Sequence, residues 1–223
     1  MCRRASEKST VHGIHRSHPI YLNSVHALKM DLTDRRLFDK TFREIKHKAV
    51  IHTAGATDPN WCQENPEPSK LMNVTVTTWI AEWCAEKNIP LVFTSSDLVF
   101  EGTDSPYREE DPVNPVCLYE EQKVRAEQAI ADIYPEALIC RMPLLFGWTG
   151  SELKNFDYHM IQALRRGESV SLFSDEYRTP VDGESATRGI LHFLGKAKGC
   201  FIWAGKPEYP GMTWGKSWQN CLG

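Results

Sequence analysis

The feature that most constrains the fold is the alternation of strand-like and helix-like segments along the 223-residue chain. Short apolar runs suited to buried strands occupy residues 11–16, 49–55, 89–96, 137–141 and 201–205. Segments with apolar side chains at helical spacing begin at Asp31, where Asp31 or Thr33 is expected to cap the helix, and occupy 69–87, 119–133 and 156–166. The alternation predicts an α/β fold, in which helices cover both faces of a parallel sheet through right-handed crossovers.

Composition argues against several classes of protein. A net charge of −3 gives no reason to expect nucleic acid or an anionic membrane as a partner. No apolar run approaches the roughly 18–20 residues that cross a bilayer, and no apolar segment follows the N-terminus as in a signal peptide. The seven cysteines form no C-x-x-C pair and the histidines show no ligand pattern. We therefore expect no metal site, and reduced thiols in a cytoplasmic protein are favoured over a disulfide or metal framework.

The clearest chemical motif joins the end of the strand-like run 89–96 to the helix that starts at Tyr119. The run ends in the hydroxyl residues Ser95 and Ser96, and Lys123 follows Tyr119 at i+4, on the same helix face. A nearby lysine ammonium is expected to lower the tyrosine pKa towards the working pH. Such a set could move a proton to or from a carbonyl oxygen while a nicotinamide moves a hydride. The alternatives are a chance Y-x-x-x-K pair and a turn or cap serine at Ser96.

Five motifs follow one another in a fixed order between residues 95 and 181. They are SSDLVFEG at 95–102, PYREED at 106–111, Pro115 with Tyr119, RMPLLFG at 141–147 and DEYRTPV at 175–181. In this order they resemble the motifs of dTDP-4-dehydrorhamnose reductases, which are extended short-chain dehydrogenase/reductases. Relatives of these enzymes include the regulatory β subunit of methionine adenosyltransferase. The resemblance spans residues 11–205 and implies a Rossmann-type doubly wound parallel sheet that binds NAD or NADP.

The resemblance also implies roles for single residues. Ser96 would hydrogen-bond the substrate carbonyl, Tyr119 would donate the proton in reduction, and Lys123 would bind the nicotinamide ribose and tune Tyr119. Arg16 could pair with a 2′-phosphate, which favours NADP(H) over NAD(H), unless it is a solvent-facing turn arginine. Besides Tyr119 and Lys123, the residues implied at the cofactor are Arg16, Asp31, Leu32, Thr53, Ala54, Gly55, Asn73, Met142 and Pro143. Those implied at the substrate are Asp97, Val99, Phe100 and Arg178.

The chain departs from the family pattern in three respects. It begins just before the equivalent of the second strand, so the first strand and its G-x-x-G-x-x-G loop are not in it. Without the backbone donors of that loop we expect weak dinucleotide binding, and a slot in the sheet where the strand would lie. Glu120 and Glu121 would bring negative charge near the nicotinamide. Leu144 stands where rhamnose reductases have a substrate-contacting tryptophan.

Three hypotheses of function remain open from the sequence. The first is NAD(P)H-dependent reduction of a keto group on a nucleotide-sugar-like small molecule. The second is a non-catalytic regulatory or binding protein on the same fold, and the third is an inactive, truncated gene product. We expect a single domain over residues 1–223, in which residues from 145 to 223 form a partial substrate-binding portion. The expected assembly is a homodimer or a complex with a regulatory partner protein.

Overall fold

The computed structural model describes residues 1–147, 156–171 and 178–205. The chain forms two compact units. The first comprises Met1–Arg141 and Thr187–Ile202, and the second comprises Met142–Ala186 and Trp203–Gly223. Residues 175–177 of the last sequence motif and the segment 206–223 lie outside the described residues.

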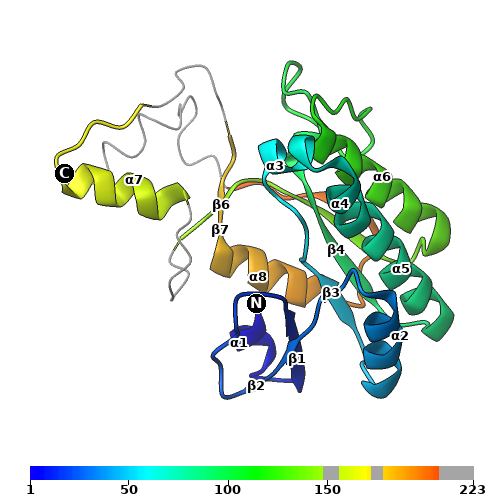
Figure 1. Cartoon of the computed structure of the whole chain (residues 1–223). Helices are drawn as coiled ribbons and strands as arrows, with labels where there is room; N and C mark the ends of the chain where they lie inside the picture. The colour runs from blue at the N-terminus through cyan, green and yellow to red at the C-terminus, as the bar shows by residue number, and fades with distance from the viewer. Residues whose placement is uncertain (148–155, 172–177, 206–223) are drawn as a thin grey trace. The chain divides into compact units, whose positions relative to one another are not determined.

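The first unit contains two parallel sheets within its described residues (Figure 1). In the smaller sheet, β1 (Val11–His15) pairs with β2 (Val25–Lys29). The larger sheet has the strand order β3-β4-β5-β8, with bounds Val50–His52, Leu91–Ser96, Leu138–Met142 and Gly199–Ile202. The printed pairs of this sheet, β3 with β4 and β5 with β8, are parallel, which confirms the predicted parallel α/β fold. β2 was not predicted, because most of its side chains face solvent and it lacks an apolar alternation.

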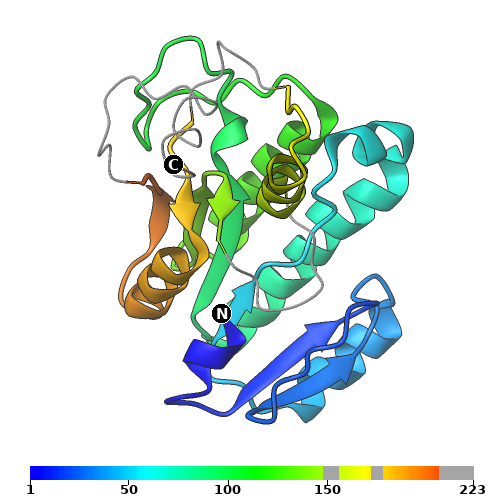
Figure 2. The same cartoon turned by 90° about the vertical axis from the view of Figure 1, so that its left-hand side faces the viewer.

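Helices α2 (Arg35–Glu44), α5 (Val76–Lys87) and α6 (Leu118–Ile133) lie along one face of the larger sheet, and α8 (Gly183–Phe193) lies along the other (Figures 1 and 2). The core on the first face joins Phe38 of α2, Ile80 of α5 and Ile130 of α6 to Phe93 of β4. Apolar side chains at helical spacing create this core, because each helix buries one stripe against the strands. Burial of this stripe aligns α6 with the end of β4, where the candidate site lies.

The start of α2 differs from the prediction. Its N-cap is Asp34, whose carboxylate accepts a hydrogen bond from the Leu37 N–H at 3.0 Å. Asp31 instead accepts from the backbone N–H and the hydroxyl of Thr33, at 2.9 and 2.7 Å. This local turn places Asp31 and Thr33 before the helix, so the prediction that one of them caps it was wrong.

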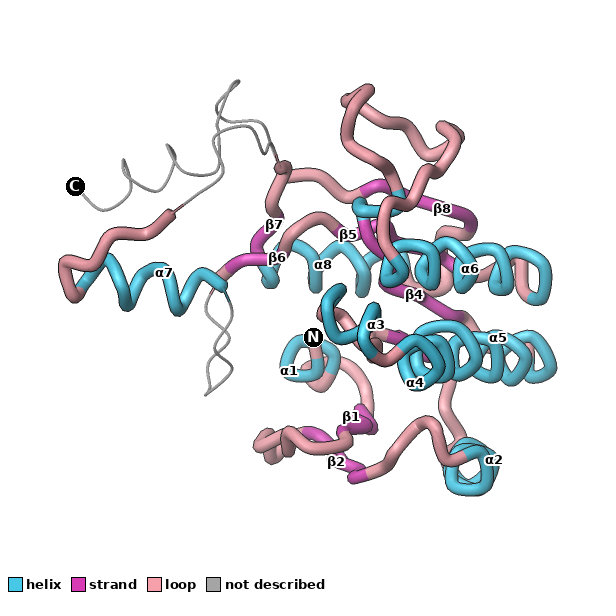
Figure 3. The backbone as a smooth tube through the Cα atoms, turned by 45° about the horizontal axis from the view of Figure 1, so that its top comes forward, coloured by secondary structure: helices cyan, strands magenta, loops and turns pink. Residues whose placement is uncertain are grey.

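The helix expected over residues 69–87 is present along its whole length, but its winding changes within it (Figure 3 draws the helical segment in cyan). It contains the end of α4 (Pro66–Lys70), a π-helical turn (Leu71–Thr75) and α5. A further helix, α3 (Pro59–Glu64), precedes them and was not predicted. Asp58 caps α3 by accepting from the N–H groups of Asn60 and Trp61, and Pro59 fits its first turn because proline needs no donor there. The π-helical turn matters for function because it contains Asn73.

The remaining elements are shorter. α1 (Cys2–Ala5) precedes β1 in the first unit. In the second unit β6 (Leu145–Phe146) pairs in parallel with β7 (Val181–Asp182), and α7 (Phe156–Arg165) lies between them in sequence. Among the described residues, no helix has both the length and the apolar character needed to cross a bilayer. The same residues contain no cluster of three or more histidine, cysteine, aspartate or glutamate side chains able to hold a metal ion.

Candidate active site

The three residues predicted to act in catalysis meet at the carboxyl end of β4. Ser96 is the last residue of that strand, and Tyr119 and Lys123 lie in the first two turns of α6. β3 runs parallel to β4, so the segment 53–56 that follows β3 emerges at the same edge. In doubly wound sheets this edge is where ligands bind, because loops from several strands meet there. All three side chains are buried.

Ser96 connects the strand end to Tyr119. Its hydroxyl lies near enough to the Tyr119 side chain to lower the pKa of that tyrosine. The Ser96 oxygen also accepts a bond from the Leu98 N–H at 3.2 Å, which caps a short 3₁₀ turn over Asp97–Val99. A hydroxyl has two acceptor sites and one donor, so one serine can do both. The cap interpretation and the catalytic hypothesis for Ser96 are therefore compatible.

The acidity of Tyr119 differs from the expectation. Burial raises the pKa of Tyr119 to about 12, and the hydrogen bond from Ser96 lowers it only in part. The half-buried carboxylate of Asp97 acts in the same direction as burial, because it disfavours a phenolate nearby. The prediction that Lys123 lowers this pKa was wrong for this structure, since desolvation dominates. Tyr119 is thus held in the protonated form, which can donate a proton.

Lys123 lies where three parts of the site converge. Its ammonium donates to the Thr94 carbonyl oxygen at 3.0 Å and lies 4.8 Å from the centre of the Phe93 ring. A side-chain carbon added at Gly55 would lie 3.7 Å from the Lys123 nitrogen and 3.2 Å from the Asn73 amide oxygen. Burial lowers the pKa of Lys123 to about 8. Because Gly55 has no side chain, a ligand can approach its backbone closely beside the Lys123 ammonium. The ammonium has three N–H donors and the Thr94 carbonyl accepts from one of them, so this arrangement fits ribose hydroxyls.

A buried amide network holds the segment after β3. The Asn73 side chain donates to the Ala56 carbonyl at 3.0 Å and accepts from the Ala56 N–H at 2.8 Å. The same amide donates to the Gln122 oxygen at 2.8 Å, and Gln122 donates to the Ser69 hydroxyl at 2.8 Å. Asn73, predicted at the cofactor, therefore directs its amide to the protein backbone. Gln122 and Ser69 were missed, because nothing in the sequence distinguishes a buried helical glutamine from an exposed one.

His52, the last residue of β3, is a second buried polar residue that sequence analysis missed. Its Nε2 lies 3.0 Å from the Thr77 hydroxyl, and that hydroxyl donates to the Asn73 carbonyl at 2.8 Å. The His52 carbonyl accepts from the Thr94 hydroxyl at 3.2 Å. Burial, followed by the charge of Lys123, lowers the pKa of His52 from its ordinary 6.5 to about 3. The imidazole is therefore neutral at all moderate pH values.

This neutral histidine predicts an acid-sensitive stability. Between pH 6.5 and 3 the unfolded chain binds a proton at His52 that the folded chain rejects. The free energy of unfolding should therefore fall as the pH falls, by on the order of 1 kcal/mol per pH unit from this group. Urea unfolding from pH 7 to pH 5 measures the slope. His52→Gln should flatten it and His18→Gln, on the surface, should not; equal slopes in all three proteins contradict the assignment.

The other residues predicted at the cofactor lie as follows. Arg16, just after β1, is exposed, and its guanidinium lies 3.8 Å from the Asp31 carboxylate. Leu32 packs partly buried against the core. Thr53 is exposed and Ala54 half-buried beside Gly55. Met142 and Pro143 were predicted at the nicotinamide. Met142 is the last residue of β5 and Pro143 follows it; both are buried and belong to the second unit.

The residues predicted at the substrate are dispersed. Val99 is fully buried against Val124, and Phe100 stacks on Tyr107 with ring centres 4.3 Å apart. These two side chains pack inside the loop after β4. Asp97 is half-buried close enough to affect Tyr119, and Arg178 is half-buried in the second unit. Of the four, the geometry supports Asp97 best as a group beside the reacting atoms.

The two glutamates after Tyr119 both make contacts near the start of α6. Glu120 accepts from the N–H groups of Val116 and Cys117, at 2.7 and 3.2 Å, and so completes a capping box at the start of α6. Its charge stabilises the helix terminus that presents Tyr119. Glu121 pairs on the surface with Arg125 at 3.5 Å. Leu144 is half-buried, and its carbonyl accepts from the Val181 N–H.

The sequence is similar to those of known proteins. The probable low-salt glycan biosynthesis reductase Agl14 of Haloferax volcanii is 32% identical over 194 residues, covering 86% of this chain and 64% of the relative. Methionine adenosyltransferase 2 subunit beta of Xenopus tropicalis is 32% identical over 118 residues, which are 53% of this chain and 35% of that protein. The chain thus spans less than two thirds of these relatives.

A solved structure shows the same fold. The hypothetical dTDP-4-dehydrorhamnose reductase of Sulfolobus tokodaii matches with a TM-score of 0.81 and 25% identity, over 92% of this chain and 71% of that one. The family description that matches residues 2–208 is the RmlD substrate binding domain. The resemblance found in the sequence motifs is confirmed, and the chain belongs to the RmlD substrate binding domain family.

Proposed function

We propose that this protein reduces a keto group on a nucleotide-sugar-like small molecule, with NAD(P)H as the reductant. The observation that carries the proposal is the burial of Ser96 and Tyr119 together at the end of β4, where Ser96 acts on the pKa of Tyr119, with Lys123 one helical turn beyond Tyr119. This is the arrangement of a proton donor beside a carbonyl-binding hydroxyl. The name of the Sulfolobus relative supports the same class of reaction.

The side chains have separable tasks in such a reduction. The Ser96 hydroxyl orients the substrate carbonyl and hydrogen-bonds Tyr119. Tyr119 is protonated below about pH 12 and donates its proton to the carbonyl oxygen as negative charge develops there. A bound nicotinamide cofactor supplies the hydride. Asp97 disfavours a phenolate and so keeps Tyr119 in the acid form. The site is therefore suited to reduction more than to oxidation at neutral pH.

The residues around Lys123 fit a dinucleotide. Lys123 would bind the ribose hydroxyls through the donors that Thr94 leaves available, and Gly55 would let the backbone approach the cofactor closely. Arg16 would hold a 2′-phosphate, because its guanidinium is exposed just after the end of β1. We therefore favour NADPH over NADH.

The test is loss of reduced-nicotinamide absorbance with dTDP-4-keto sugars, and binding of NADPH and NADH by calorimetry. NADPH should bind and react better than NADH. Arg16→Ala should weaken NADPH binding about tenfold, the size of one charged hydrogen bond, and leave NADH unchanged. Arg36→Ala, an exposed arginine of α2, serves as the matched control. Equal losses of affinity for NADPH and NADH would exclude Arg16 as a ligand of the 2′-phosphate.

A second candidate is a regulatory subunit without turnover. The match to methionine adenosyltransferase 2 subunit beta supports it, although that match covers only 53% of the chain. In this case the cofactor would bind without being oxidised. Binding of NADPH by the wild-type protein, with no turnover on any of a set of nucleotide-linked keto sugars, would favour the second candidate over the first.

A further inference from the structure

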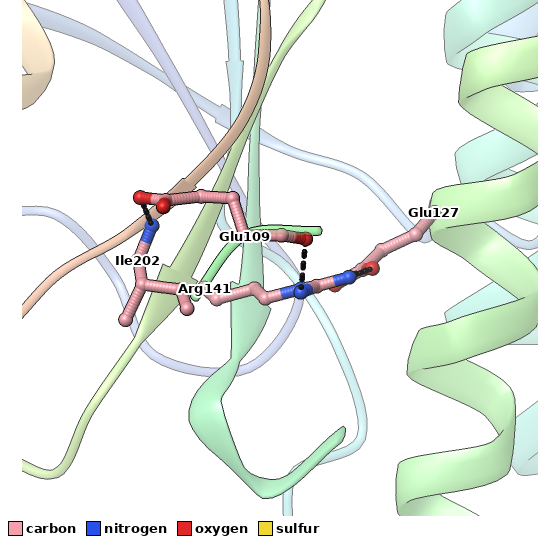
Figure 4. Close-up of polar contacts among 4 residues, drawn as sticks. All are labelled: Glu109, Glu127, Arg141 and Ile202. Atoms are coloured by element: carbon pink, nitrogen blue, oxygen red, sulfur yellow. Dashed lines mark hydrogen bonds and ion pairs between the residues drawn. The ribbon is translucent and has the colours of Figure 1, made fainter. Parts of the chain in front are cut away.

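A buried ion pair lies on the helix that presents Tyr119 and Lys123. Arg141 of β5 donates to Glu127 of α6, with Nη2 to Oε2 at 2.9 Å and Nε to both carboxylate oxygens at 3.2 Å. The two side chains are only 8% and 9% exposed. Figure 4 shows the guanidinium pointing along the strand surface to the helix. Because a buried pair of this kind adds little to stability over apolar packing, stability alone does not account for its place in the core.

The same guanidinium holds the loop that separates Ser96 from Tyr119. Its Nη1 donates to the Glu109 carbonyl at 3.2 Å, and its centre lies 4.9 Å from the centre of the Phe100 ring. Glu109 in turn accepts from the Ile202 N–H of β8 at 3.0 Å (Figure 4). The loop over residues 97–117 is thereby tied to α6, β5 and β8, so its two catalytic ends are fixed together.

The pair also lies in register with the catalytic residues. Tyr119, Lys123 and Glu127 follow one another at intervals of four and share one face of α6. Glu127 raises the pKa of Lys123, against the larger effect of burial. Other groups facing Lys123 are Cys62 of α3, which also raises its pKa, and the neutral His52 of β3.

Cys200 of β8 lies near the same pair. Burial raises the pKa of its thiol most, the charges of Glu127 and Glu109 raise it further, and the charge of Arg141 lowers it. We propose that Arg141 and Glu127 are positioning residues: the pair sets the net charge one helical turn from Lys123 and holds the loop between Ser96 and Tyr119. This rests on the proposed reductase function, and it explains why an ion pair occupies a core position.

The two halves of the pair should act on Lys123 in opposite directions. Glu127→Gln removes the negative charge of the pair and leaves the positive charge of Arg141 unbalanced. This should move the titration midpoint of Lys123 below about 8. Arg141→Gln leaves the negative Glu127 alone and should move it upward. Each shift should be on the order of one pH unit, as for a nearby buried charge. A purely structural pair would destabilise the fold in both variants and move the midpoint in neither.

The experiment is a pH titration of ¹³Cε-labelled lysine by NMR, with Lys123→Met to assign the resonance. If Arg141→Gln does not fold, the double variant Glu127→Met/Arg141→Met replaces both charges by apolar groups of similar length. Its midpoint should fall below the wild-type value by less than in Glu127→Gln. A midpoint within 0.2 pH units of the wild-type value in every folded variant, a bound of roughly the error of such titrations, overturns the charge-setting role.

Arg141→Lys separates charge from geometry. It keeps the positive charge but loses the fork that reaches both Glu127 and the Glu109 carbonyl. The Lys123 midpoint should stay in place while kcat falls about tenfold through misalignment of the site, and KM should change little. An unchanged kcat overturns the loop-holding role. The NMR titration needs no turnover, so shifted midpoints in a protein without reductase activity would refute the proposed function and leave this inference standing.

Discussion

Tyr119→Phe will lower kcat of carbonyl reduction by about 10²–10⁴-fold, the contribution expected of a general acid. The substitution removes one oxygen from a buried ring, so the packing of the site is kept. The proton that the pKa of about 12 holds on Tyr119 is lost, together with the interaction between its hydroxyl and Ser96. Binding of the nicotinamide cofactor should change little, because Lys123 bonds to Thr94 and not to the phenol. Single-turnover and steady-state assays measure the loss.

Tyr134→Phe is the matched control. Tyr134 is also buried, and it lies at the opposite end of the same helix, as the C-cap of α6. Its variant should keep kcat within about twofold of the wild type, as expected for a residue that touches no reacting atom. Full activity in Tyr119→Phe would exclude Tyr119 as the proton donor. Equal losses in both variants would point to a general weakening of α6.

Phe38→Ala will lower the free energy of unfolding by about 3–5 kcal/mol, as for other truncations of buried aromatic side chains. This is the largest effect on stability among the substitutions proposed here. Phe38 is 1% exposed and stacks on Phe42 with ring centres 4.1 Å apart. It also contacts the Trp79 ring at 5.8 Å, so it joins α2 to α5. Removing it opens a cavity between two helices that cannot close without moving one of them. Urea unfolding followed by tryptophan fluorescence measures the change.

Leu37→Ala tests whether this loss comes from the core. Leu37 precedes Phe38 on the same helix but is 37% exposed. Its replacement should lower the free energy of unfolding by less than about 1 kcal/mol, as is usual near a protein surface. A comparable loss in the two variants would show that α2 contributes through its helical structure and not through the contact between Phe38 and its neighbours.

The sequence predicted those features that depend on local spacing. The pairing of Tyr119 with Lys123 follows from helical geometry alone, and the parallel sheet follows from alternating segments. The cap of α2 was assigned wrongly because the prediction chose between Asp31 and Thr33, although Asp34, also of a residue type that caps helices, follows directly. Only the local turn at Asp31 decides among them.

Features that depend on burial could not be predicted. The acidity of Tyr119 is governed by desolvation, which is a sum over the surrounding fold and can outweigh a neighbouring charge. His52 and Gln122 look like ordinary polar residues in the sequence, and only the packing of α5 and α6 against β3 reveals that they are enclosed. The π-helical turn before α5 likewise leaves no mark in the apolar pattern.

The two hydrogen bonds between Asn73 and Ala56 affect the entropy cost of ligand binding at this segment. An asparagine amide that donates to the C=O and accepts from the N–H of one residue imitates a neighbouring strand, so the segment beside Lys123 has its shape before anything binds. Ordering a free loop of this kind would oppose binding by roughly 1–2 kcal/mol per residue. A preorganised segment avoids that entropy loss, because its conformation is already fixed before a ligand binds.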